Sequence, residues 1–333
     1  MADTMTKSPA LDQIVAPILP WIREVDRRVD AVVASKEPLM SDLVAHVRRF
    51  RGKRLRPALV LMAARCAGDR VPSEAVMDLA LITELVHTAT LIHDDVIDRA
   101  DTRRNSPSFN LRWDNQVAVI FGDYLFSKAF LMTVRIADLP ARERLAEVTG
   151  DLCEGEMLQL ESRIKRGMSE EEYMEMILRK TATFLGCCTA MGARLAGLET
   201  RHVETLDRVG ERLGCAFQIV DDCLDLMGSE GTMGKSLGTD IATGKFTLPL
   251  IKFVETLGPA EVETLESLMG AGKGDEAKAF VHSRLPESGA VEAAWAEARR
   301  FTEAALRDLE SLPESPGRNE LIQISNYLIS RSH

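Results

Sequence analysis

The sequence predicts an all-α protein. Leu and Ala recur throughout while aromatic residues make up only 5%, a balance that suits stacked helices better than sheets. Apolar residues recur at helical spacing from Leu11 to about Ser330, and no segment shows the alternation of a strand. The 333 residues are 45% hydrophobic and contain no internal repeat or low-complexity linker, which allows one large core. We therefore predict a single domain over residues 11–333, preceded by a flexible N-terminus, residues 1–10.

Short polar or Gly/Pro-rich segments divide this pattern into roughly ten or more helices. The segments lie at residues 33–38, 49–57, 66–72, 99–107, 165–169, 227–245 and 271–275. From about Gly258 the predicted helices are shorter and more charged. We expect this last part to pack at the periphery as one or two hairpins.

Charge and targeting patterns exclude several classes of protein. The chain has 41 Lys and Arg against 51 Asp and Glu, a formal net charge of −10, which argues against binding to nucleic acid or to an anionic membrane. The polar N-terminus does not resemble a secretion signal, and no uninterrupted apolar run reaches the ~18 residues of a spanning helix. Six cysteines show no C-x-x-C pair and are expected to be buried thiols. These features predict a cytoplasmic protein.

The first unusual feature is a group of aspartates at the end of a predicted helix, about Glu74 to Ile97. Asp94 and Asp98 are four residues apart and share a helix face with His87, whereas Asp95 lies about 100° round the helix. Two stacked carboxylates at a helix C-terminus repel each other and oppose the helix dipole. A bound cation would remove both problems.

A second aspartate group occurs in the apolar helical stretch FQIVDDCLD, residues 217–225. Asp221, Asp222 and Asp225 repeat the DDxxD spacing, and Gln218 precedes Asp221 by about one turn on the same face. Oxygen ligands at this spacing suit Mg²⁺, which takes one or two carboxylates plus water and substrate phosphates. One such group is often a solvated helix face, but two in apolar helices indicate a metal-dependent site.

Basic residues in this acidic chain gather where they can bind an anion. Six of the ten residues at 48–57 are basic, and Gly52 followed by Lys53 and Arg56 is compact enough to bind a diphosphate. Arg103 and Arg104 follow the first aspartate group. We expect these residues to face the metals.

A glycine-rich segment, residues 228–245, carries Lys235 and Lys245 and can close over phosphates. Within it SEGTMGKS approaches the phosphate-binding loop of nucleotidases. However, Ser229 stands where the first glycine belongs and a helix precedes the segment instead of a strand. We therefore discount a nucleotidase.

Taken together, these motifs resemble the head-to-tail trans-isoprenyl diphosphate synthases, the polyprenyl synthetase family, of the medium- and long-chain type. The matching pieces span essentially the whole chain in family order: GKRLRP (52–57), HTATLIHDDVIDRADTRR (87–104), GDYL (122–125), KTA (180–182), FQIVDDCLD (217–225) and GKSLGTDIATGKFTLPLI (234–251). The resemblance implies a homodimer whose chains are antiparallel helical bundles of the isoprenoid synthase type, with both aspartate groups facing a central substrate cavity.

The resemblance also implies a role for each motif residue. Two Mg²⁺ ions would bind Asp94, Asp95 and Asp98, and a third Asp221 with Asp222 and Asp225. The allylic diphosphate would be held by the ions and by Arg103, Lys180, Gln218, Lys235 and Lys245, with Thr181 near the leaving oxygen. Isopentenyl diphosphate would bind Lys53, Arg56, His87 and Arg104. As alternatives, His87 is a core histidine and Thr181 bonds its own helix backbone.

The chemistry fits these roles. Breaking an allylic carbon–oxygen bond leaves a diphosphate and a carbocation, so catalysis consists mainly of stabilising the leaving charge with metals and cationic side chains. No side-chain nucleophile is needed. Water must be kept from the cation, which gives a closing loop a second purpose.

Product length depends on the wall of a tunnel beside the first aspartate helix. Ala89 and Thr90, five and four residues before Asp94, are small, whereas short-chain members of the family have an aromatic near this place. Phe126 and Phe130 of the next helix are expected deeper in the tunnel, the alternative being core or dimer packing. We predict an all-trans polyprenyl diphosphate longer than geranylgeranyl, with a geranylgeranyl or farnesyl diphosphate synthase as the alternative.

Other classes of protein fit the sequence less well. A terpene cyclase would not need the second diphosphate site formed by Lys53, Arg56 and His87. A partner subunit of a heteromeric synthase could dispense with its aspartates, which this chain keeps. A helical scaffold with structural Mg²⁺ would need no diphosphate-binding residues at all.

Overall fold

The computed structural model describes residues 11–49, 52–98, 102–103, 106–227, 238–270 and 272–330. Arg104, Lys235 and the predicted flexible segment 1–10 lie outside these residues. Within them the elements of regular structure are helices, apart from the two-residue strands β1 (Thr102–Arg103) and β2 (Ser106–Pro107), which pair antiparallel. The predicted all-α class is confirmed.

The helices follow one another with short connections. In order they are α1 (Leu11–Val15), α2 (Leu19–Val33), α3 (Pro38–Arg49), α4 (Leu55–Ala64), α5 (Glu74–Ile97), α6 (Phe109–Trp113), α7 (Asn115–Arg135), α8 (Leu139–Lys165), α9 (Glu170–Ile177), α10 (Thr183–Leu195), α11 (Thr200–Met227), α12 (Thr239–Ala242), α13 (Leu248–Val254), α14 (Pro259–Gly270), α15 (Gly274–His282), α16 (Leu285–Ser288), α17 (Ala290–Glu310) and α18 (Pro316–Ser330). Short 3₁₀ turns η1 (Ala16–Ile18) and η2 (Arg65–Ala67) and a π-helical turn η3 (Leu178–Ala182) complete the list.

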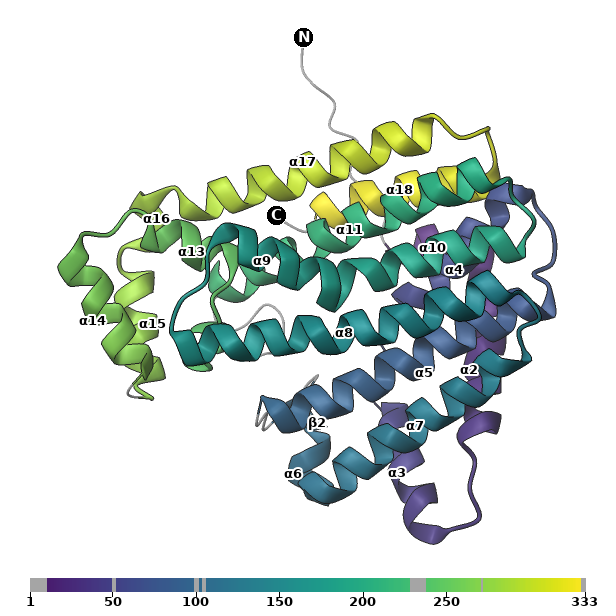
Figure 1. Cartoon of the computed structure of the whole chain (residues 1–333), viewed down its shortest axis with the longest axis horizontal. Helices are drawn as coiled ribbons and strands as arrows, with labels where there is room; N and C mark the ends of the chain where they lie inside the picture. Colours follow the sequence, from purple (N-terminus) through teal and green to yellow (C-terminus); the bar gives the residue numbers. More distant parts are fainter. Residues whose placement is uncertain are drawn as a thin grey trace.

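The long helices run side by side along the molecule (Figure 1). Helix α10 packs on α4 and α11, α11 packs on α17, and α5 packs on α7. Helices α14 to α16 gather at one end, as predicted for the C-terminal part (Figure 1). In contrast, α17 has 21 residues and packs along α11, so this part is not made only of short peripheral helices.

Two groups of buried side chains form the interior. The larger one joins α1 to α8 with α10, the first half of α11 and α18. The smaller one joins α9, η3 and the second half of α11 with the helices from α13 to α17. Helix α11 belongs to both, through Leu206 and Leu213 on one side and Ile219 and Leu226 on the other. Its aspartates are therefore carried into the middle of the molecule.

Helix α5 matches the range predicted from the sequence. It begins after Ser73, whose hydroxyl accepts a hydrogen bond from the Val76 amide at 3.3 Å, and it ends at Ile97. Such a cap satisfies one of the free amides at a helix start. Residues on nearly all sides of α5 are buried, as expected for a core helix, so its charged residues lie inside the protein.

Helices α5 and α7 are each long and apolar enough, by length and composition alone, to cross a membrane. This differs from the sequence expectation, which counted uninterrupted apolar runs. In α5 the apolar window is 67% buried, which is typical of a core helix, but in α7 only 33% is buried. Five apolar side chains of α7 face outward: Val119, Ile120, Phe130, Leu131 and Val134.

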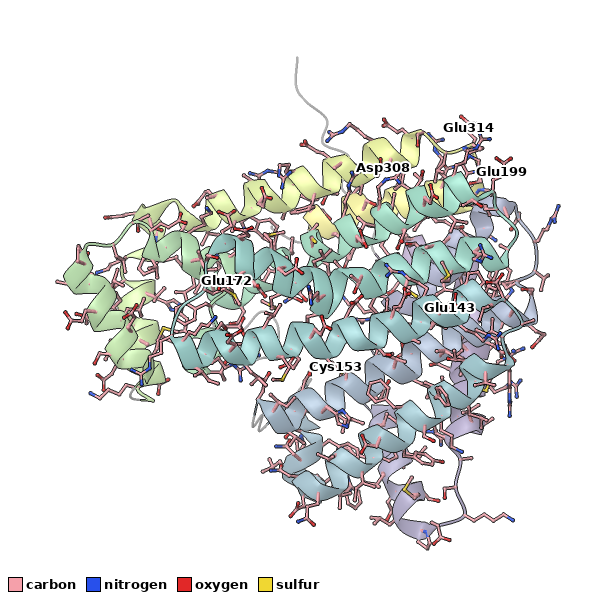
Figure 2. All side chains as sticks on the ribbon, in the orientation of Figure 1. Glu143, Cys153, Glu172, Glu199, Asp308 and Glu314 are labelled. Atoms are coloured by element: carbon pink, nitrogen blue, oxygen red, sulfur yellow. The ribbon has the colours of Figure 1, made fainter. Side chains whose placement is uncertain are left out.

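The cysteines are all free thiols. Cys187, Cys188, Cys215 and Cys223 are buried, as predicted. Two cysteines differ from this prediction: Cys66 is only partly buried, and Cys153 is exposed on the side of α8 that faces α5 (Figure 2).

Candidate active site

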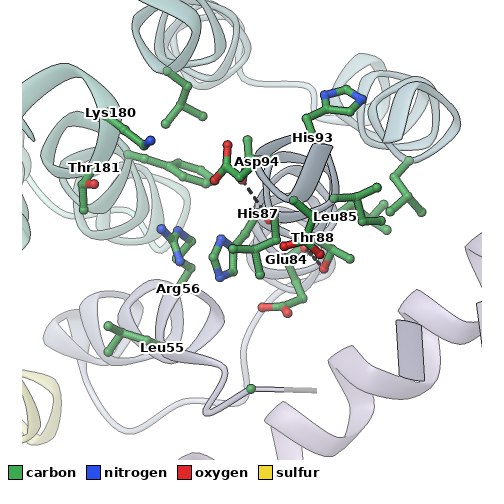
Figure 3. A pocket seen from close by; sticks show the side chains of 18 of the residues that line it. Leu55, Arg56, Glu84, Leu85, His87, Thr88, His93, Asp94, Lys180 and Thr181 are labelled. Atoms are coloured by element: carbon green, nitrogen blue, oxygen red, sulfur yellow. Dashed lines mark hydrogen bonds between the residues drawn. The ribbon is translucent and has the colours of Figure 1, made fainter. Parts of the chain in front are cut away.

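A cavity of about 1460 Å³ separates α4 and α5 from α8, η3 and α11. Charged and polar side chains gather along part of its wall: Lys53, Arg56, His87, Asp94, Asp98, Lys180, Thr181, Gln218, Asp221 and Lys245. Figure 3 shows Arg56, His87, Asp94, Lys180 and Thr181 converging on one space from different helices. The structure therefore brings together most of the described residues that the sequence predicted for a diphosphate site.

The first aspartate group lines this cavity with all three of its residues, Asp94, Asp95 and Asp98. The two oxygens of Asp98 accept hydrogen bonds from Arg163 Nη2 and Lys245 Nζ, both at 2.6 Å. Burial opposes the charged form of Asp98, but Lys245 and Arg163 outweigh it and hold its pKa below its usual value. Asp98 is therefore an ionised carboxylate held between two cations.

Asp95 occupies a different environment. It is 1% exposed, and its Oδ2 lies 3.4 Å from the backbone amide of Phe109 at the start of α6. This is the side of α5 that the sequence placed about 100° from Asp94. Asp95 thus helps to hold the segment that follows the first aspartate group.

The second aspartate group, in contrast, is divided between the cavity wall and the interior behind it. Asp221 lines the cavity. Asp222 is buried, and it accepts hydrogen bonds from Tyr173 Oη at 2.7 Å and Gln218 Nε2 at 2.8 Å. Asp225 accepts hydrogen bonds from Thr239 Oγ1 at 2.9 Å and from the Asp240 amide at 3.1 Å. Neither Asp222 nor Asp225 is part of the described cavity wall.

Burial has a strong effect on the carboxyls behind this wall. Desolvation, with the nearby charge of Asp240, raises the pKa of Asp222 well above its usual value. Burial also raises the pKa of Asp240 to about 6, with a further contribution from Asp225. Among the described residues, no three His, Cys, Asp or Glu side chains form a group that could hold a metal ion. A cation at these aspartates would need further ligands from water or a substrate.

The cations on the opposite wall include one with an unsatisfied donor. The guanidinium of Arg56 lies 5.2 Å above the Phe184 ring, and its buried Nε has no hydrogen-bond partner. Burial lowers the pKa of Arg56 below its ordinary value. Lys53 is exposed, with its Nζ 3.4 Å from Tyr327 Oη. A buried donor without an acceptor is costly, so Arg56 is suited to receive an anion.

Lys180 and Thr181 lie in the π-helical turn η3. Single π-helical turns inside α-helices are frequent at functional sites because they shift the register of the side chains. Lys180 pairs with Glu156 and donates to Gln159 Oε1 at 2.5 Å. Thr181 Oγ1 donates to Gln218 Oε1 at 3.1 Å. The alternative, that the Thr181 hydroxyl bonds the backbone of its own helix, is therefore not what the structure shows, since this hydroxyl donates to a side chain of α11.

Helix α8 contributes site residues that the sequence reasoning missed. Glu156, Gln159 and Arg163 are three and four residues apart, lie largely buried on one face, and contact Lys180 or Asp98. The available signal was the spacing in EGEMLQLESR, which puts three polar residues on one helix face.

Lys245 follows α12, where its backbone amide donates to Asp240 O at 2.8 Å. Burial opposes its charged form, but Asp240 and Asp98 raise its pKa above the ordinary value. Arg103 lies in β1, and nothing is described of its side chain.

Comparison with known proteins decides the family. The family model described as polyprenyl synthetase matches residues 37–283. The chain is 34% identical to an all-trans-nonaprenyl-diphosphate synthase (geranyl-diphosphate specific) of Rhodobacter capsulatus, over 96% of this chain and 97% of that one. It is 36% identical to a short chain isoprenyl diphosphate synthase of Methanothermobacter thermautotrophicus, over 86% and 89%. The chain belongs to the polyprenyl synthetase family.

A solved structure supports the same assignment for the fold. The polyprenyl synthase of Caulobacter crescentus, complexed with calcium and isoprenyl diphosphate, superposes with a TM-score of 0.90 at 33% identity, covering 98% of this chain and all of that one. The predicted isoprenoid synthase fold and the predicted enzyme class, a prenyltransferase, are confirmed.

The residues predicted to set product length in this polyprenyl synthetase lie in different places. Thr90 and Phe126 line the cavity, and the Phe126 ring stacks on His93 with centroids 5.9 Å apart. Ala89 is completely buried and is not part of the described cavity wall. Phe130 is 72% exposed on α7. The expectation that Phe130 lies deep in the tunnel is wrong for the single chain, because its position on α7 turns it outward.

Besides α5 and the expected α7, the apolar part of the cavity extends to α2 and α3, which the sequence did not indicate. Beyond Leu85 on α5 it is lined by Val33 of α2, Val44 and Val47 of α3, and Phe121 and Leu125 of α7. These residues are far from the aspartate motifs in the sequence, so only the fold brings them to the cavity.

Proposed function

We propose that this prenyltransferase condenses isopentenyl diphosphate with an allylic diphosphate, head to tail, to give an all-trans polyprenyl diphosphate longer than geranylgeranyl. One observation carries the proposal. A single cavity places carboxylates of α5 and α11 opposite Arg56 and Lys180 and continues into an apolar lobe. Such a cavity suits two diphosphates at its polar end and a growing hydrocarbon at its apolar end.

We assign the two substrates to different cations. Isopentenyl diphosphate would bind Lys53, Arg56 and His87 near the start of α4, together with Arg104. The unpaired Nε of Arg56 supports this assignment. The allylic diphosphate would bind on the side of η3 and α11, through Lys180, Thr181, Gln218, Lys235, Lys245 and Arg103.

We further propose Mg²⁺ as the cofactor, with three ions held by the two aspartate groups. The donor set fits, because Asp94, Asp98 and Asp221 offer oxygen ligands at the cavity wall and Mg²⁺ completes its shell with water and phosphate oxygens. Asp95 also lines the cavity and would complete the first ligand group, whereas Asp222 and Asp225 would support Asp221 from behind. Bound Mg²⁺ would supply positive charge to the leaving diphosphate.

The chain's own residues would perform three tasks. Lys180 and Lys245 would bind the leaving diphosphate and stabilise its charge as the carbon–oxygen bond breaks. Arg56 and His87 would hold isopentenyl diphosphate with its double bond toward the allylic carbon. The apolar walls, including Leu85 and Leu125, would keep water from the carbocation. The released diphosphate can accept the proton lost from the new chain, so a side-chain base is not required.

Product length would be set along α5. Thr90 lines the cavity one turn before Asp94, and a helical turn of about 5.4 Å is close to the length of one five-carbon unit. We propose that Thr90 and Phe126 form the wall and that Ala89 leaves room behind it. The Rhodobacter capsulatus relative is named for a nonaprenyl product, which supports a long chain.

We propose that the protein is a cytoplasmic homodimer formed through α7. The outward apolar side chains of α7 include Ile120, 66% exposed, and Phe130, 72% exposed. An exposed apolar face of this kind, interrupted here only by the exposed Asp123 and Ser127, often marks an interface, and a two-fold axis would pair α7 with its copy. Covering this face with a second chain would explain the apolar composition of α7 without a membrane.

The deciding experiment incubates the purified protein with Mg²⁺ and labelled isopentenyl diphosphate. Parallel reactions contain dimethylallyl, geranyl, farnesyl or geranylgeranyl diphosphate, and the products are resolved by length. We expect a ladder that continues beyond geranylgeranyl. A stop at farnesyl or geranylgeranyl would overturn the proposed length, cyclic products would indicate a terpene cyclase, and no elongation would indicate a partner subunit.

A further inference from the structure

Arg54 lies between the two proposed diphosphate-binding residues Lys53 and Arg56, yet it takes part in a different set of contacts. Its side chain pairs with Glu84 of α5 and donates from Nε, at 2.8 Å, to Asp26 Oδ1 of α2. A second contact joins Nη2 to the same Asp26 oxygen at 2.7 Å. Arg54 thus ties the loop before α4 to two other helices.

The backbone of Arg54 is unusual as well. Its φ of 53° and ψ of 38° are left-handed, and it is the residue that precedes the first turn of α4. A non-glycine residue adopts this conformation only where its surroundings enforce it. The contacts of Arg54 with α2 and α5 can enforce it, and they thereby fix the direction in which the chain enters α4.

These ion pairs are largely shielded from water. The side chains of Arg54 and Glu84 are 10% and 6% exposed, and that of Asp26 is 23% exposed. Removing one partner of a buried pair leaves the other charge uncompensated. The loop is therefore held much more firmly than an ion pair at the surface would hold it.

On α5, Glu84 lies next to His87, one of the proposed diphosphate-binding residues. It is three residues before His87, about one helical turn, and both residues line the cavity. Figure 3 shows Glu84 below His87, on the side of α5 that faces the start of α4. The pair with Arg54 consequently sets the distance between the loop that carries Lys53 and the helix that carries His87.

We propose that Arg54 and Glu84 are positioning residues for the diphosphate of isopentenyl diphosphate, an inference that rests on the proposed function. Neither residue needs to touch the substrate. Arg54 holds its neighbours Lys53 and Arg56 against α5, so that their cations and His87 converge on one diphosphate. The allylic site does not depend on this pair, because Lys180 lies on η3 and Lys245 follows α12.

The test compares Glu84→Gln with a control at a second buried ion pair, which joins η2 to α18. Arg65 and Glu320 lie at the other end of α4, with both side chains 8% exposed and Nε to Oε1 at 3.0 Å. Glu320→Gln therefore removes a comparable charge from a comparable environment, away from the cavity. Both variants would be measured for the KM of each substrate, for kcat, for Tm, and for binding of isopentenyl diphosphate alone by calorimetry.

We expect Glu84→Gln to raise the KM and Kd for isopentenyl diphosphate by about tenfold or more, with the KM for the allylic substrate changed less than about twofold. Glu320→Gln should lower Tm without this selective change. The inference is overturned if Glu84→Gln affects both KM values equally, or only Tm. Should Glu84→Gln not fold, Asp26→Asn replaces it. This variant weakens the other ion pair of Arg54, on the more exposed side, and must give the same selective change.

The outcome also separates this inference from the proposed function. If the unaltered protein elongates isopentenyl diphosphate and Glu84→Gln does so with the same KM, only the positioning role fails. If the unaltered protein binds no isopentenyl diphosphate in the calorimeter and makes no product, the proposed function fails and the inference with it.

Discussion

Gly155 allows α8 to approach η3, and replacing it with alanine should damage the site by a predictable amount. A Cβ atom at Gly155 would lie 2.4 Å from the backbone N of Lys180 and 2.7 Å from its Cα. Ordinary contacts of a Cβ begin at 3.4 Å, so α8 and η3 would have to separate by about 1 Å. Because the obstruction is backbone, no change of rotamer can relieve it.

This displacement acts on both Lys180 and Thr181, which η3 carries. Overpacking of this kind costs about 1–3 kcal/mol in the free energy of unfolding, and a displacement of about 1 Å at a reacting centre can cost about 10²-fold in rate. We therefore expect Gly155→Ala to reduce kcat by about 10- to 100-fold, with a moderate fall in stability.

Gly150 provides the matched control, since it lies in the same helix and a Cβ there would meet nothing within 4 Å. Gly150→Ala should keep full activity and gain about 0.5–1 kcal/mol, because alanine loses less entropy in a helix. Initial rates at saturating substrate and urea unfolding measure both variants. The reasoning is refuted if Gly155→Ala is destabilised as expected but retains the kcat of the unaltered protein, since the position of η3 would then not limit the rate.

Four further substitutions test other parts of the site and its surroundings. Thr90→Phe should shorten the product because Thr90 lines the cavity, and Ala89→Phe should in addition cost about 1–3 kcal/mol, because Ala89 is completely buried; product ladders unchanged in both would exclude a tunnel along α5. Phe130→Glu should convert the proposed dimer to monomers in light scattering after gel filtration, since it puts a charge on the apolar face of α7; a dimer that persists places the interface elsewhere. Tyr173→Phe removes the hydroxyl that donates to Asp222 and should cost about 1–3 kcal/mol in urea unfolding; an unchanged midpoint would show that this buried bond contributes nothing.

The local features of α5 could be predicted from the sequence because they depend on nearby residues. Apolar periodicity predicts a helix whose observed bounds, Glu74–Ile97, are the predicted ones, and the cap at Ser73 is a local feature of its start. The DDxxD spacing also placed Asp94 and Asp98 on one face, and both line the cavity. The relative positions of side chains on one helix follow from their spacing, so the sequence was sufficient to predict them.

The different surroundings of the aspartates in the second group could not be predicted in this way. Asp222 is covered by Tyr173 of α9, and Asp225 accepts a hydrogen bond from Thr239 at the start of α12. These partners are distant in sequence, so only the packing of α9 and α12 on α11 separates these two residues from Asp221. The π-helical turn around Lys180 likewise lies against Gly155 of α8, a contact between distant residues that no local pattern indicates.

Phe130 was placed wrongly for a related reason. Helix α7 is apolar on most of its surface, so periodicity does not tell which face meets the cavity and which face points outward. The fold resolves this, because Phe126 stacks on His93 while Phe130 is exposed. The same ambiguity arises wherever a helix contributes to both a core and a surface that a second chain can cover.

The pairing of charges around the cavity explains how one site can be both stable and ready to bind two diphosphates. Lys180 is already paired with Glu156, and Lys245 with Asp98. Because these lysines lost much of their hydration on folding, binding a phosphate exchanges one anionic partner for another and requires little further desolvation. Arg56 differs, since its buried Nε has no acceptor in the protein, and an incoming diphosphate removes a penalty that folding left in place. Binding should therefore gain most at Arg56, which makes the loop held by Arg54 the part of the wall whose position matters most.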